Sequence, residues 1–106
     1  MSTKKNINQN LINRLESIAG ERLTFGNLIK SIRLGEEMTQ ESFALLLEIS
    51  KQYLCDIEKG RRCVSPKLAA KYADILGYSK SQFIRLCLQD LLEREGFHMV
   101  VSVEAA

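Results

Sequence analysis

Five short segments of this sequence each begin with a serine or threonine that can cap a helix, and this pattern constrains the fold most. At an N-cap, the side-chain oxygen accepts a hydrogen bond from a backbone N–H that the helix itself leaves without a partner. Pro66 follows the fourth cap at the first helical position, where a missing N–H costs nothing. The five caps are Thr24, Thr39, Ser50, Ser65 and Ser79. They predict an all-α domain of five short helices.

Apolar residues recur at helical spacing behind each cap, which gives every predicted helix one face to bury. The chain has 106 residues, 45% hydrophobic and 26% charged, which fits one globular domain and excludes a disordered chain. Residues predicted to face inward are Phe25, Leu28, Ile29, Ile32, Phe43, Ala44, Leu47, Leu54, Ile57, Leu68, Ala69, Tyr72, Ala73, Leu76, Phe83, Ile84 and Cys87.

Two terminal segments flank this domain of residues 23–94. For residues 1–22 we expect a polar, mobile start followed by an extra helix from Leu11 to Ala19 that stops at Gly20. Residues 95–106 alternate apolar and polar side chains past Gly96, which predicts a short strand over 97–103. A lone strand needs a partner, either a second copy of the chain or another protein. The predicted dimer or partner contact uses Leu88, Leu91, Leu92, Phe97, Met99, Val101 and Val103.

Several classes of site are excluded by residue counts and spacing. The three cysteines lack zinc spacing and His98 is the single histidine, so we expect no metal, no cofactor and reduced thiols. One histidine cannot complete a catalytic triad, and no glycine-rich phosphate loop occurs, so an enzyme is not expected. No apolar run is long enough for a membrane span, and the polar start lacks a signal core, so a cytoplasmic location is predicted.

The stretch from Met38 to Arg62 contains two short capped helices joined by a tight turn around Glu48 and Ile49. On the second helix, the buried positions leave a polar outer face at its N-terminal end. A helix presented in this way fits the DNA major groove, which is about 12 Å wide. Its first turn also offers free N–H groups to phosphates.

This stretch resembles the helix-turn-helix family of phage lambda repressor and Cro, the Xre-type regulators. The resemblance rests on Thr-Gln-Glu-x-x-Ala from Thr39, Ile-Ser at Ile49, and Ile-Glu-x-Gly-Arg from Ile57, and it covers about residues 23–77. The implied fold is a five-helix, lambda-repressor-like domain, to which the patterns described above add an extra N-terminal helix and a short C-terminal β-strand. Glu48 and Glu37 replace glycines usual in the family, and a non-glycine residue with positive φ is uncommon.

The resemblance also implies a role for individual residues. Lys51 and Gln52 would read base edges, with Cys55 and Asp56 one turn further on, facing the groove or its wall. Phosphate contacts are implied for Gln40, Ser50, Tyr53, Lys59, Arg61 and Arg62, and a structural ion pair for Arg33 with Glu58. Two alternatives stay open: Tyr53 could pack on its own helix, and Cys55 could be an inert surface thiol or a redox sensor.

The charge distribution supports a DNA site independently. The whole chain carries +2, whereas residues 50–71 hold six basic and two acidic residues, so the remainder is net negative. We predict a sequence-specific DNA-binding transcriptional regulator, a repressor that binds a palindromic operator as a homodimer. The alternative is an antitoxin that neutralises a RelE-like ribonuclease toxin and represses its own operon, using Leu11–Ala19 or the terminal strand as the toxin-binding element.

Overall fold

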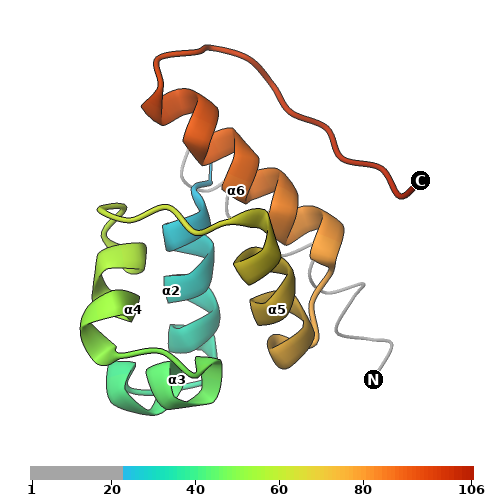
Figure 1. Cartoon of the computed structure of the whole chain (residues 1–106). Helices are drawn as coiled ribbons and strands as arrows, with labels where there is room; N and C mark the ends of the chain where they lie inside the picture. Colours follow the sequence, from blue (N-terminus) through green and yellow to red (C-terminus); the bar gives the residue numbers. More distant parts are fainter. Residues whose placement is uncertain (1–22) are drawn as a thin grey trace.

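The fold was obtained as a computed structural model, which describes residues 23–106 (Figure 1). The expected helix over 11–19 and the polar start lie outside the described residues. The described helices are α2 (Phe25–Gly35), α3 (Gln40–Leu47), α4 (Lys51–Glu58), α5 (Pro66–Leu76) and α6 (Lys80–Arg94). The predicted all-α domain with five capped helices is therefore confirmed for this part of the chain.

Every one of these helices begins at the cap that the sequence predicts. In each case the Ser or Thr oxygen accepts a hydrogen bond from the backbone N–H three residues further on, at 3.0–3.3 Å. Helix ends are set by left-handed residues at two places, Glu48 after α3 and Gly77 after α5. The boundaries are thus determined locally, by side chains within a few residues of each helix end.

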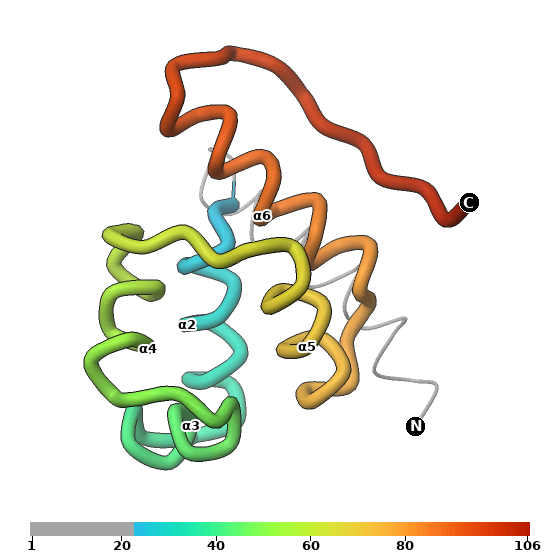
Figure 2. The backbone as a smooth tube through the Cα atoms, viewed as in Figure 1, coloured from blue at the N-terminus to red at the C-terminus, as the bar shows by residue number. Residues whose placement is uncertain are grey.

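The helices surround α2, as the ribbon and the tube show (Figures 1 and 2). Helix α4 packs on one side of α2, and α6 packs on another. Helix α3 joins α2 to α4 and also contacts α5, while α5 lies along α6. Because α4 is held from one side by α2 and α3, its other side stays open to solvent.

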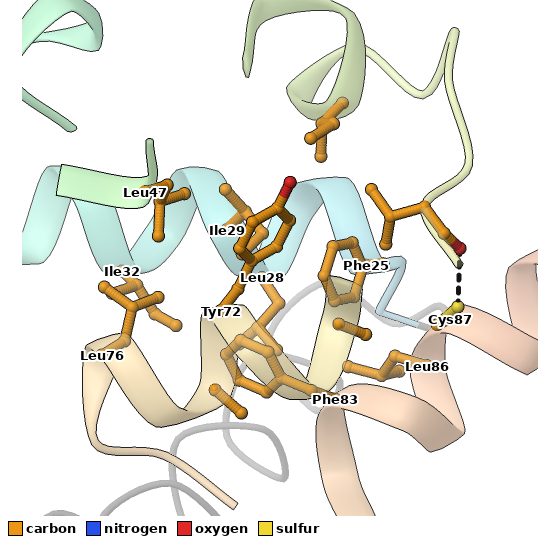
Figure 3. Close-up of a cluster of buried hydrophobic side chains, with 14 of the residues drawn as sticks. Phe25, Leu28, Ile29, Ile32, Leu47, Tyr72, Leu76, Phe83, Leu86 and Cys87 are labelled. Atoms are coloured by element: carbon orange, nitrogen blue, oxygen red, sulfur yellow. Dashed lines mark hydrogen bonds between the residues drawn. The ribbon is translucent and has the colours of Figure 1, made fainter. Parts of the chain in front are cut away.

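The core between these helices is built from buried apolar side chains (Figure 3). The rings of Phe25 and Phe83 meet edge to face, with their centroids 5.7 Å apart. The Cys87 thiol donates a hydrogen bond to the Val64 carbonyl oxygen at 2.9 Å, which ties the loop before α5 to α6. Nearly all predicted inward positions are buried. Ile84 and Leu68 are only half-buried, and Leu86, which the periodicity did not single out, is fully buried.

The predicted C-terminal strand over 97–103 is wrong, because no strand forms among the described residues. The segment is extended and runs back along α6, as Figure 1 shows. Instead of a second strand, it pairs with one buried side chain: Gln89 donates to the Met99 carbonyl at 2.6 Å and accepts from the Val101 N–H at 2.9 Å. A strand requires a backbone ladder, and one amide side chain supplies only a single rung.

Candidate nucleic-acid interface

Helix α4 is presented to solvent by the turn that precedes it. Glu48 adopts φ 63° and reverses the chain after α3, and its N–H together with that of Ile49 closes the last turn of α3. Ser50 then caps α4 by accepting a hydrogen bond from the Tyr53 N–H at 3.0 Å. Leu54 and Ile57 are buried beneath the helix. The first turn of α4 therefore points away from the core.

A buried ion pair holds the C-terminal end of α4 against α2. Arg33 donates to both carboxylate oxygens of Glu58, with N···O distances of 2.7 and 3.0 Å. Gln40, at the start of α3, donates to the same carboxylate at 3.1 Å. The hydrogen bond with Glu58 raises the pKa of the Arg33 guanidinium. One carboxylate thus fixes α2, α3 and α4 relative to one another.

The residues expected to read bases lie together on the open side of α4. Lys51 and Gln52 are exposed, while Cys55 and Asp56 are partly covered. Lys51 forms an ion pair of 2.8 Å with Glu41 of α3, and both side chains are more than half exposed. The same contact raises the pKa of Lys51 and lowers that of Glu41. Exposed pairs of this kind contribute little to stability, so phosphates or bases can replace the Glu41 partner.

Two arginines from the loop after α4 fold back onto that helix. The Arg62 guanidinium lies over the Tyr53 ring, 4.6 Å from its centroid. Arg61 donates to one carboxylate oxygen of Asp56 at 3.0 and 3.1 Å, and to the Cys55 sulfur at 3.8 Å. The arginine holds the pKa of the Asp56 carboxyl below its ordinary value. These contacts place the Arg62 guanidinium beside the first turn of α4 and the Arg61 guanidinium beside its second turn.

The remaining expected phosphate contacts have different surroundings. Lys59 and Ser50 are exposed at the two ends of α4. Gln40 is half-buried, and its amide is engaged with Glu58. Tyr53 is also half-buried, because it packs against the core on one side and under Arg62 on the other. The structure therefore brings all of the expected DNA-contacting residues to the α3–α4 side of the molecule.

Two residues with important contacts in the structure were not predicted from the sequence. Glu41 is the partner of Lys51, and Gln89 is the residue that holds the C-terminal segment. Glu41 sits ten residues before Lys51 on another helix, so no spacing within one helix connects the two. Gln89 is 1% exposed within an otherwise apolar helix face, and a polar residue interrupting such a face was the available signal.

Among the described residues, no helix has both the length and the apolar character needed to cross a membrane. In the same part of the chain, no three histidine, cysteine, aspartate or glutamate side chains gather in a way that could hold a metal ion.

Two short helices joined by a left-handed turn, with the second helix open to solvent and flanked by arginines, define a helix-turn-helix DNA-binding protein. A family model described as helix-turn-helix matches residues 29–83, and the chain belongs to this family of Xre-type DNA-binding transcriptional regulators. Its curated relatives include control protein C.BamHI of Bacillus amyloliquefaciens, which is 39% identical over 57 residues. That alignment covers 53% of this chain and 70% of the relative. No solved structure matches the chain.

Proposed function

We propose that this protein recognises a specific DNA sequence by placing the first turn of α4 in the major groove. The observation that carries the proposal is the exposed pair Lys51 and Gln52 above the buried Leu54 and Ile57. Lysine donates to the acceptors of guanine, and glutamine pairs with adenine through a donor and an acceptor. Cys55 and Asp56 lie one turn further along the same side, toward the groove wall.

The proposed phosphate contacts come from both ends of this helix. Arg61 and Arg62 supply the cationic groups of the loop, and Lys59 lies beside them. Ser50 and Gln40 stand at the N-terminal ends of α4 and α3, where free N–H groups favour an anion. Tyr53 contributes by supporting the Arg62 guanidinium. Phosphate contacts of this kind set the register of a protein on DNA without reading its sequence.

Binding measurements with duplex DNA test this division of roles. Lys51→Ala or Gln52→Ala is expected to relax the preference at one base pair and to cost about 1–3 kcal/mol on the preferred site. Arg62→Ala is expected to weaken binding to all duplexes and to flatten the salt dependence of the binding constant. Equal losses on preferred and scrambled duplexes for all three variants would refute the assignment.

We further propose that the protein acts as a homodimeric repressor on a palindromic operator. Two half-sites would then lie about 34 Å apart, one turn of the double helix. Support comes from the distribution of exposed apolar residues. Among the described residues, four of the seven large exposed ones lie within residues 91–100: Leu91, Phe97, Met99 and Val100. Leu88, Leu92, Val101 and Val103 are partly buried beside them and extend the same apolar surface.

The backbone of the C-terminal segment adds a second argument for self-association. The Phe97 N–H donates to the Leu92 carbonyl, and the Gln89 side chain bonds to the Met99 carbonyl and the Val101 N–H. These backbone groups therefore point toward α6. The intervening residues His98, Val100 and Ser102 make no backbone hydrogen bond to any described residue. This edge, which is unpaired within residues 23–106, can pair with the same edge of a second copy.

Light scattering of the full chain after size exclusion tests the dimer surface. Met99→Ser is expected to shift the protein toward monomer, whereas Leu45→Ser serves as the matched control. Leu45 is 80% exposed on α3, at the other end of the molecule from the C-terminal segment (Figure 1). An unchanged dimer in Met99→Ser, or dissociation in Leu45→Ser, would place the interface elsewhere.

An antitoxin role is the second candidate, favoured by the same open edge, to which a toxin strand could be added. The other proposed toxin-binding element, Leu11–Ala19, lies outside the described residues. A short basic ribonuclease-like reading frame beside the gene, and co-purification of its product with this protein, would support this role. Absence of such a reading frame, together with no toxin-like protein co-purifying from the native host, would contradict it.

A further inference from the structure

A carboxylate lies on the side of α4 that is proposed to face DNA, where it would repel phosphates. This group, Asp56, accepts three hydrogen bonds on one oxygen. The Gln52 amide donates at 3.0 Å, and two nitrogens of the Arg61 guanidinium donate at 3.0 and 3.1 Å. The Asp56 side chain is 24% exposed and that of Arg61 is 54% exposed. The negative charge is therefore placed between two of the proposed DNA-contacting side chains.

The first consequence concerns the amide of Gln52. Residues 52 and 56 are four apart on one helix and lie on the same side. A free glutamine amide can rotate by about half a turn and exchange its donor and its acceptor, which present different patterns to a base pair. Because one N–H of the Gln52 amide is bonded to Asp56, the amide cannot rotate. Its carbonyl oxygen and its second N–H then stay in fixed positions. Only one orientation of the contacted base pair then matches it.

The second consequence concerns the loop after α4. The Asp56 backbone carbonyl accepts hydrogen bonds from the N–H groups of Arg61 and Arg62, at 2.8 and 3.3 Å. The side chain and the backbone of one residue thus hold the same loop. The carboxylate also offsets the charge of Arg61, so this arginine attracts any nearby phosphate less strongly than a free one would.

We propose that Asp56 is a positioning residue for sequence recognition, fixing the amide of Gln52 and the guanidinium of Arg61 and suppressing binding to unrelated DNA. The inference rests on the proposed function of α4. Asp56 acts here through Gln52 and not through a base contact of its own. Its removal should therefore change which sequences are bound more than how tightly DNA is bound overall.

The test uses the full chain and two duplexes of equal length. One is obtained by selection from random duplexes with the wild-type protein, and the other is its scrambled sequence. We expect Asp56→Ala to lower the ratio of the two affinities about tenfold, with the loss confined to the base pair read by Gln52. The affinity for the scrambled duplex should rise several-fold, with a steeper salt dependence, because one anion has been removed. Asp56→Asn, which keeps an acceptor oxygen, should retain more of the base preference than Asp56→Ala.

Two comparisons separate positioning from other roles. In a Gln52→Ala background, Asp56→Ala should have no further effect on base preference. Asp74→Ala removes another exposed carboxylate, one paired with Lys80 outside the proposed interface, and should leave the base preference unchanged. Equal melting temperatures of the variants, followed by circular dichroism, show that folding is not the cause.

The outcomes distinguish this inference from the proposed function. A wild-type protein that binds no duplex at low salt would overturn the proposed function. Selective binding by the wild type with an unchanged preference in Asp56→Ala would overturn only the positioning role. If Asp56→Ala caused the same loss of base preference with and without Gln52, Asp56 would contact a base directly, and the positioning role would also be overturned.

Discussion

Removing the Glu58 carboxylate should destabilise the domain more than any surface substitution. The Glu58 side chain is 3% exposed and that of its partner Arg33 is 11% exposed. Glu58→Ala deletes two hydrogen bonds from Arg33 and one from Gln40, and it leaves a guanidinium with little access to water. Breaking one side of a buried pair costs about 3–5 kcal/mol. Arg33 keeps one bond to the Met38 carbonyl at 3.1 Å, so we expect a loss of about 3 kcal/mol.

Urea denaturation followed by circular dichroism measures this loss as a change in the free energy of unfolding. For a domain of this size, about 3 kcal/mol corresponds to a fall in melting temperature of roughly 12–24 °C. Glu58→Gln keeps the volume and one acceptor and should lose less. The double variant Arg33→Met with Glu58→Leu should recover most of the stability, because an apolar pair leaves no charge unpaired. A loss below about 1 kcal/mol for Glu58→Ala would mean that the pair behaves as an exposed one and would refute the reasoning.

Three further substitutions test the backbone and the core, each by urea denaturation. A Cβ at Gly26 would collide with the Ile57 carbonyl oxygen, so Gly26→Ala should cost about 1–2 kcal/mol, whereas Gly35→Ala, with open space around it, should not destabilise. Glu48 holds φ 63°, so Glu48→Gly should stabilise by about 0.5 kcal/mol and Glu48→Ala should not; equal effects would count against backbone strain. Among the described residues, no group meets hydrogen-bond geometry with the buried Tyr72 hydroxyl, although Tyr53 lies close enough to interact with it, so Tyr72→Phe should match the wild type at neutral pH. Burial raises the pKa of Tyr72 from 10.0 to about 12, so between these pH values the folded state keeps a proton that the unfolded state loses. The free energy of unfolding of the wild type should therefore fall by roughly 2–3 kcal/mol as the pH rises through this range. An equal fall in Tyr72→Phe would contradict this.

The helices could be predicted from the sequence because their boundaries depend on neighbouring residues. A cap such as Ser50 acts on an N–H three residues away, so the signal lies within one turn. The left-handed turn at Glu48 was harder to predict, since glutamate lacks the backbone freedom of glycine, and the positive φ follows from the way α3 and α4 pack. The same applies to Glu37, with φ 56° before α3.

The C-terminal segment could not be predicted correctly from its alternating pattern. That pattern describes which side chains face inward, and Val101 and Val103 are indeed less exposed than Val100. The pattern does not say what satisfies the backbone, and here one side chain of α6, Gln89, replaces a neighbouring strand. Extended structure and strand pairing are separate properties, and only the first was encoded locally.

At the candidate site, residue types were accessible from the sequence, whereas their partners were not. The basic loop and the polar face of α4 follow from composition and spacing. Contacts between elements depend on the angle at which helices pack, and no single-helix spacing predicts that Lys51 meets Glu41 or that Arg62 covers Tyr53. The pair of Gln52 and Asp56 differs from these contacts, because the two residues are four apart on one helix and their spacing alone allows the contact.

The close approach of α2 and α4 at Gly26 affects how this protein can tolerate change. There the two helices meet through main-chain atoms, with the Ile57 carbonyl directly above the glycine. The tilt of α4 against α2 is therefore limited by a contact that contains no side chain from either helix. Substitutions elsewhere in the hydrophobic interior can swap one aliphatic group for another without changing this minimum separation. A library that randomises the interior while keeping position 26 fixed should thus yield many folded proteins in which α4 keeps the same tilt against α2.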